Sequence, residues 1–126
     1  MRIVIAIFLA LHGFAHLAGF AMSFGLAESI PYRTTVLGGT VDLGDGGIRV
    51  IGVLWVLAAL AFLTASAAAM TSQDWWITAT LVAAVTSLVL CLLSLPEARI
   101  GVMLNLLILA AIWVWMSPRV GLRGIR

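Results

Sequence analysis

Four long apolar stretches constrain this chain more than any other feature. They run from about Ile3 to Gly25, Val50 to Met70, Trp75 to Leu95 and Ile100 to Met116. A helix needs roughly 20 mostly apolar residues to cross the hydrocarbon core of a bilayer. Of the 126 residues, 63% are hydrophobic and 10% are charged, which leaves too few charges to cover a small water-soluble domain. We therefore expect one all-α domain, residues 1–126, embedded in the lipid bilayer.

The connections between these stretches predict how the helices are arranged. The segments "TSQD" (71–74) and "PEAR" (96–99) are tight turns, so the second, third and fourth helices should be sequential antiparallel neighbours. The first connection, about Leu26 to Arg49, is long and glycine-rich, and we expect an extramembrane loop there. Its charged residues include Glu28, Arg33, Asp42 and Asp45. We interpret "GDGG" (44–47) as a turn within this loop. The sequence thus predicts an up-down-up-down four-helix transmembrane bundle.

The arginines indicate an orientation, because basic residues favour the cytoplasmic side of a membrane. One end of the predicted bundle carries Arg2 and the tail arginines at 119, 123 and 126. The other end carries Arg33, Arg49 and Arg99. The cluster in the tail favours both termini in the cytoplasm, with the long loop outside.

Charge and cysteine content exclude several classes of function. The net charge is only +2 and the arginines are scattered or confined to the tail, so we expect no nucleic-acid partner. A single cysteine, Cys91, excludes an internal disulfide and a cysteine-rich metal or iron–sulfur centre. The sequence has no recognisable Ser-His-Asp or Cys-His arrangement, so an enzyme is not the favoured interpretation.

Polar residues interrupt the apolar stretches on single helix faces. His12 and His16, in "LHGFAHLAGF" (11–20), lie four residues apart and share a face with Gly19 and Ser23. The third stretch carries a stripe of small and weakly polar residues: Thr80, Ala84, Ser87, Cys91 and Ser94. The fourth contains Asn105. Because an unpartnered polar group is costly in lipid, these side chains should meet inside the bundle.

The depth of each polar residue in the membrane predicts where these side chains meet. At about 1.5 Å per residue, His16 lies roughly 13 Å and Asn105 roughly 8 Å below the long-loop side. The polar residues would then form a pocket that opens under the loop, with Asp42 and Asp45 near its mouth. We expect His16 to matter more than His12, because it lies nearer Asn105 and the open side.

The histidine pair has a structural and a functional interpretation. As structural residues, both would be neutral imidazoles that hydrogen-bond to Asn105, Ser87 or a carbonyl and fix the register of the helices. As functional residues, they would bind a ligand or carry a proton, since ionisable residues within a membrane commonly serve function.

Three kinds of ligand are compatible with the functional interpretation. A quinone or another lipophilic molecule needs an apolar pocket with a few hydrogen-bonding groups, which His16, Asn105 and Trp55 would supply. A metal held by His12 and His16 needs a third ligand, from Glu97, Asp42, Asp45 or Cys91. Haem would need a single histidine ligand or a dimer, because both histidines lie on one helix.

Four segments carry a resemblance to a known family. They are "LHGFAHLAGF", "IRVIGVLWVLAALAFL" (48–63), "WW" (75–76) and "EARIGVMLNLLILA" (97–110). In these segments, in size and in layout the chain resembles the DoxX-like proteins, which are small bacterial four-helix membrane proteins. The resemblance implies a multi-pass protein of a bacterial-type inner membrane. It also implies an accessory subunit of an oxidoreductase system, some of which are linked to quinone or thiol chemistry. Asn105 stands where an acidic residue is expected, which weakens the implied redox role more than the fold.

The sequence leads to one functional hypothesis and two alternatives. The leading hypothesis is an accessory integral membrane protein with a small-molecule or quinone pocket formed by His12, His16, Ser87, Asn105 and Trp55. The first alternative is a structural assembly or scaffold subunit whose helix faces dock a membrane protein partner. The second is a small transporter, which four helices would form only as a homo-oligomer.

Overall fold

Four membrane-length helices make up the chain in a computed structural model that describes residues 1–118. The first span consists of α1 (Arg2–Ala15) and α2 (Leu17–Ser23), and the others are α3 (Gly44–Met70), α4 (Trp76–Leu93) and α5 (Arg99–Met116). Each span is long and apolar enough to cross a membrane. Two short strands, β1 (Thr35–Val36) and β2 (Val41–Asp42), form a hairpin. The predicted all-α four-helix bundle is confirmed.

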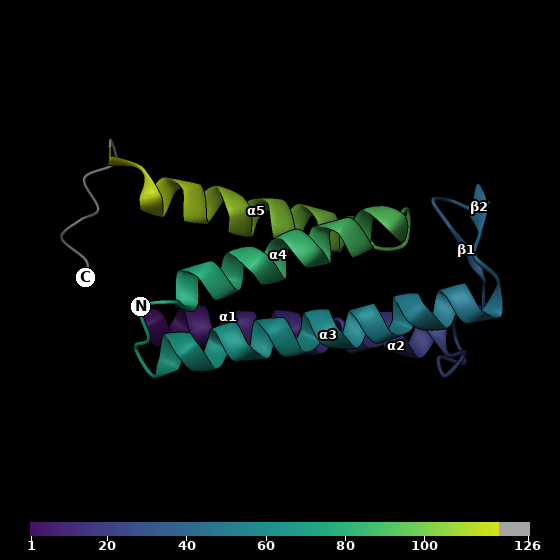
Figure 1. Cartoon of the computed structure of the whole chain (residues 1–126), viewed down its shortest axis with the longest axis horizontal. Coiled ribbons are helices and arrows are strands. Elements are labelled where there is room, and N and C mark those ends of the chain that lie inside the picture. Colours follow the sequence, from purple (N-terminus) through teal and green to yellow (C-terminus); the bar gives the residue numbers. More distant parts are fainter. Residues whose placement is uncertain (119–126) are drawn as a thin grey trace.

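The spans alternate in direction along the bundle. Figure 1 shows the N-terminus, the α3–α4 connection and the end of α5 at one end of the molecule, and the β-hairpin at the other. The α4–α5 connection returns to the hairpin end. The hairpin and the residues around it therefore form a cap over one end of the bundle.

Small side chains allow the helices to approach closely. Ala58, Ala65, Ala83 and Ala84 are completely buried between α3 and its neighbours. A Cβ atom at Gly13 would lie 3.0 Å from the Phe62 Cβ and 3.1 Å from a backbone oxygen of α3. In lipid, where apolar surface gains nothing by leaving the solvent, such close packing is a main source of helix association.

The last helix contributes least to the buried interior. Only Asn105 and Ile108 of α5 are buried. Several of its large side chains, among them Met103, Leu107 and Trp113, are exposed, as expected of a helix that faces lipid on most sides.

The second span begins earlier than predicted, at Gly44 rather than Val50. The segment "GDGG" is therefore the first turn of α3 and not a loop turn, and the long connection ends at Leu43. Two carboxylates explain this start. The Asp42 Oδ1 accepts a hydrogen bond from the Gly44 N–H (2.9 Å), and Asp45 lies in the first turn, where a helix favours negative charge.

The first span is interrupted at His16, which separates α1 from α2. The His16 N–H donates to the Gly13 oxygen (3.1 Å), one residue short of the usual α-helical acceptor. The His12 backbone oxygen instead accepts a hydrogen bond from the His16 imidazole, whose Nδ1 lies 2.7 Å away. The interruption was not predicted, because it depends on where this one side chain points.

The long connection is fixed to the end of α4. Residue Thr35 pairs with Asp42 and Val36 with Val41 in the hairpin. Beyond the strand, the Leu37 N–H donates to the Leu93 oxygen (2.8 Å) and the Gly38 N–H to the Leu95 oxygen (3.0 Å). These bonds also satisfy carbonyl groups that the end of a helix leaves without partners.

Tryptophans gather at the opposite end of the bundle. The ring centroids of Trp76 and Trp115 lie 6.3 Å apart at an interplanar angle of 74°. Trp75 and Trp113 are exposed beside them. The tail arginines at 119, 123 and 126, on which the predicted orientation depends, lie outside the described residues.

Candidate functional site

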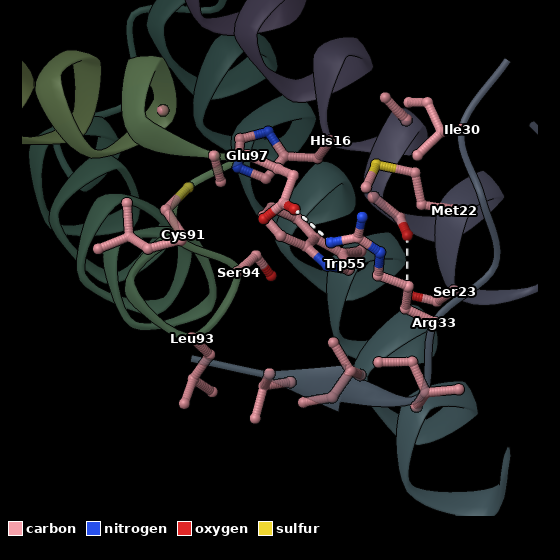
Figure 2. Close-up of a pocket in the computed structure, with 18 of the residues that line it drawn as sticks. His16, Met22, Ser23, Ile30, Arg33, Trp55, Cys91, Leu93, Ser94 and Glu97 are labelled. Carbon is pink, nitrogen blue, oxygen red and sulfur yellow. Dashed lines mark hydrogen bonds and ion pairs between the residues drawn. The ribbon is translucent and has the colours of Figure 1, made fainter. Parts of the chain in front are cut away.

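A cavity of about 500 Å³ lies under the cap, at the hairpin end of the bundle. Its walls come from α1, α2, the first half of α3, the end of α4 and the start of α5. Figure 2 shows His16, Met22 and Trp55 on the helical walls, and a dashed line that joins Arg33 of the long connection to Glu97 of the α4–α5 turn. All four spans and the long connection thus enclose one space.

An ion pair crosses the outer part of this cavity. The Arg33 guanidinium lies 3.2 Å from the Glu97 carboxylate, and both side chains line the cavity (Figure 2). The two side chains remain 65% and 43% exposed, so the pair links the cap to the α4–α5 turn but contributes little free energy, about 0–1 kcal/mol. Arg33 was not predicted as a site residue, and nothing in its sequence context distinguishes it.

Asp42 and Asp45 are not among the residues that line the cavity, and their predicted place near its mouth stays a prediction. Both carboxylates hold the cap together. The Gly44 N–H and the Thr34 hydroxyl (2.8 Å) donate to Asp42, and these hydrogen bonds keep the pKa of Asp42 below its usual range. The Tyr32 hydroxyl donates to Asp45 (2.7 Å), and this bond raises the pKa of Tyr32 above its usual value.

Trp55 provides the largest flat wall of the cavity. It is buried, and its ring lies 5.4 Å from the ring of His16. A Cβ atom at Gly19 would lie only 2.4 Å from the indole, so α2 can cover Trp55 only because residue 19 has no side chain. Gly101 has the same role beside Cys91, since a Cβ there would lie 2.6 Å from the Cys91 Sγ. Both glycines are needed to hold this wall together.

A buried polar cluster lies behind the wall. His16 Nε2 and Ser87 Oγ form a short hydrogen bond that joins the α1–α2 junction to α4. The Asn105 Nδ2 donates to the same hydroxyl (2.7 Å) and to the Gly101 oxygen (2.8 Å). Ser87 is therefore the point at which the first, third and fourth spans meet, and neither Ser87 nor Asn105 has any exposed surface.

Two backbone carbonyls fix the positions of the protons in this cluster. A carbonyl can only accept, so His16 Nδ1 carries a proton and donates it to the His12 oxygen. The neutral ring then has a lone pair on Nε2, which accepts from the Ser87 hydroxyl. At the other end, the Gly101 oxygen requires the amide nitrogen of Asn105 to face it, which settles the orientation of that side chain.

His12 differs from His16 in having no such partners. It is 7% exposed and packs edge-on against Phe62, at 4.7 Å between ring centroids. Neither ring nitrogen has a hydrogen-bond partner within residues 1–118, and Nε2 is fully buried. The amide oxygen of Asn105 is also buried without a partner. Both ring nitrogens of His16 are committed to hydrogen bonds, and both histidines line the cavity. That His16 matters more than His12 stays a prediction.

The five predicted ligand-binding residues divide into two groups. His12, His16 and Trp55 line the cavity. Ser87 and Asn105 lie behind it and hold His16 in place. The lining residues that the sequence did not reveal include Met22, Arg33 and Gly101.

The described residues offer no support for the metal hypothesis. Residues 1–118 contain no group of three or more His, Cys, Asp or Glu side chains placed to hold an ion. Glu97, the predicted third ligand, is paired with Arg33. Asp42 and Asp45 are bound within the cap, and Cys91 lies against Gly101.

Comparison with protein-family models, with curated proteins and with solved structures finds no match for this chain. The resemblance to DoxX-like proteins therefore remains a prediction. Residues 1–118 define the class of the molecule: a multi-pass, four-helix membrane protein with a capped cavity among its helices.

Proposed function

We propose that this protein binds a small lipophilic molecule in the cavity between its helices and the cap. The observation that carries the proposal is a cavity among the helices that a buried histidine, His12, lines. A volume of about 500 Å³ suits a ligand of ordinary cofactor size, and apolar walls with a few polar groups are typical of such sites.

The walls favour a ligand with a flat or ring-shaped head. Trp55, His16 and Met22 offer aromatic and polarisable surfaces, and the Arg33–Glu97 pair lies where the cavity approaches the cap. A quinone head group with an apolar tail meets these conditions, as do other lipophilic ring compounds. As a binding protein, the chain would serve as an accessory subunit of a membrane oxidoreductase, the role that the DoxX-like resemblance implies.

We also propose that the chain lies in a bacterial-type inner membrane with both ends in the cytoplasm. The sequence places Arg2 and the tail arginines at one end of the bundle, and positive charge favours the cytoplasmic side. The cap and the mouth of the cavity would then face the outside.

A cavity-filling substitution tests the binding function. Ala18 lines the cavity on its exposed rim, so Ala18→Trp should fill part of it without disturbing the core. Leu17→Trp is the matched control, because Leu17 is exposed and does not line the cavity. After gentle purification, native mass spectrometry should find a small molecule bound to the parent and to Leu17→Trp but not to Ala18→Trp. Equal content in the two variants, or no bound molecule in the parent, would contradict the proposal.

A further inference from the structure

Two buried polar atoms remain without partners in the polar cluster: His12 Nε2 and Asn105 Oδ1. Their side chains are neighbours, at 7% and 0% exposure. Leaving either atom unpaired in a membrane interior is costly. An amide oxygen can only accept a hydrogen bond, so the arrangement that satisfies both atoms has His12 Nε2–H donating to Asn105 Oδ1.

With this bond the cluster becomes a closed ring of donors and acceptors. His12 donates to Asn105, Asn105 to Ser87, Ser87 to His16, and His16 back to the His12 carbonyl. Every member gives one hydrogen bond to the next, an arrangement in which the bonds polarise and strengthen one another. The ring assigns opposite tautomers to the two histidines: the proton lies on Nδ1 of His16 and on Nε2 of His12.

The His12 Nδ1 is consequently unprotonated and keeps its lone pair. It has no partner within residues 1–118, and His12 lines the cavity. Some of the other polar groups of the walls are committed to hydrogen bonds, while the hydroxyls of Ser29, Thr35 and Ser94 also line the cavity. The Ser23 hydroxyl donates to the Gly19 oxygen (2.8 Å), and Arg33 and Glu97 bind each other.

We infer that His12 Nδ1 selects the ligand of this cavity by accepting a hydrogen bond from it. The ligand is then a lipophilic molecule whose head carries a hydroxyl group, such as a phenol or a hydroquinone. A molecule whose head has only acceptors, such as a benzoquinone or an ether, makes no bond to this nitrogen. This inference rests on the proposed function, because it specifies the head group of the molecule held in the same cavity.

Three probes of similar shape test the inference: para-nonylphenol, its methyl ether para-nonylanisole, and nonyl-substituted benzoquinone. Binding to the parent protein in nanodiscs is measured by quenching of tryptophan fluorescence. The Ala18→Trp variant, whose cavity is partly filled, shows whether the probes bind in the cavity. The phenol should bind about 3- to 10-fold more tightly than the other two, which is the ratio expected for one hydrogen bond. In His12→Phe, which keeps an aromatic ring against Phe62, the ratio between the affinities for the phenol and for the anisole should fall to about one.

The outcomes separate the inference from the proposed function. A phenol preference in the parent that depends on His12 supports both. Equal or tighter binding of the benzoquinone to the parent overturns the inference but leaves the cavity as a binding site. If Ala18→Trp binds all three probes as tightly as the parent does, or if the parent binds none of them, both the inference and the proposed function are overturned. The comparison of the probes on the parent stands even if His12→Phe fails to fold.

Discussion

At the scale of single residues, two histidines four positions apart have different roles. His16 uses both ring nitrogens, one to replace a backbone bond at the α1–α2 junction and one to reach α4. His12 lines the cavity, and the inferred bond to Asn105 leaves only its Nδ1 without a partner. The sequence predicted that both would lie inside the bundle, because their spacing puts them on one face. The sequence could not show which histidine uses both of its ring nitrogens, because that depends on the Ser87 hydroxyl and the Asn105 amide, which other helices supply.

Removing the Ser87 hydroxyl should destabilise the bundle. In Ser87→Ala, His16 Nε2 and one hydrogen of the Asn105 amide lose their partner. We expect a loss of about 1–2 kcal/mol in the free energy of unfolding, measured by thermal or denaturant unfolding in detergent. Thr86→Ala is the control, since Thr86 is adjacent but exposed, and it should change little. Equal stability of the two variants would show that the cluster is not a structural link.

The only tyrosine reports on the cap. The hydrogen bond to Asp45, burial and the negative charge of Asp45 all raise the pKa of Tyr32. A raised pKa in the folded state means that Tyr32 favours folding below the ordinary tyrosine pKa, and that this contribution is lost as pH rises through the higher folded value. Ultraviolet absorbance should therefore show tyrosinate forming above about pH 10, the ordinary value. Asp45→Asn should move the midpoint down, and an unchanged midpoint would mean that the contact is absent in solution.

At the scale of helices, the spans were predictable and their ends were less so. Apolar length alone locates the four spans, because a bilayer requires that length. The start of α3 was placed too late, since glycine and aspartate in "GDGG" are typical of turns. The capping hydrogen bond from Gly44 to Asp42 and the favourable charge of Asp45 outweighed that preference. The hairpin was also missed, because its strands are only two residues each.

Two glycine substitutions with opposite expected effects on stability test the packing of α2 on α3. Gly19→Ala places a methyl group against the Trp55 indole, and we expect a loss of about 1–3 kcal/mol in stability. Gly46→Ala meets no atom within 4 Å in the first turn of α3, so it should be neutral or add up to about 1 kcal/mol. Chemical unfolding in the same detergent compares them. A Gly19→Ala protein as stable as Gly46→Ala would mean that α2 does not cover Trp55.

At the scale of the whole molecule, the cap and the four spans make one enclosed space. The sequence predicted polar residues in the half of the bundle under the long connection, from counting residues along each helix. The cavity does lie at that end. Its shape could not be predicted, because it depends on the interruption of the first span at His16 and on where the hairpin attaches to the end of α4.

Orientation in the membrane is tested by labelling an introduced thiol. Cys91 is buried, so Cys91→Ala provides a background without a reactive cysteine. Thr40→Cys, exposed in the cap, should react with a membrane-impermeant reagent on intact cells, whereas Ser117→Cys, at the opposite end, should react only after permeabilisation. The reverse pattern would place the mouth of the cavity in the cytoplasm.

In the proposed site, a closed ring of hydrogen bonds leaves His12 Nδ1 free to receive a ligand. NMR of protein that carries isotope-labelled histidine can test this arrangement, because the chain contains only two histidines and each ring nitrogen reports its own proton. At neutral pH we expect two neutral rings of opposite tautomer, His16 protonated on Nδ1 and His12 on Nε2, with His12→Phe assigning the signals. Addition of para-nonylphenol should shift the His12 Nδ1 signal more than any other. Two rings of the same tautomer, or a His12 signal that no hydroxyl ligand moves, would show that the ring does not hold this nitrogen free for a ligand.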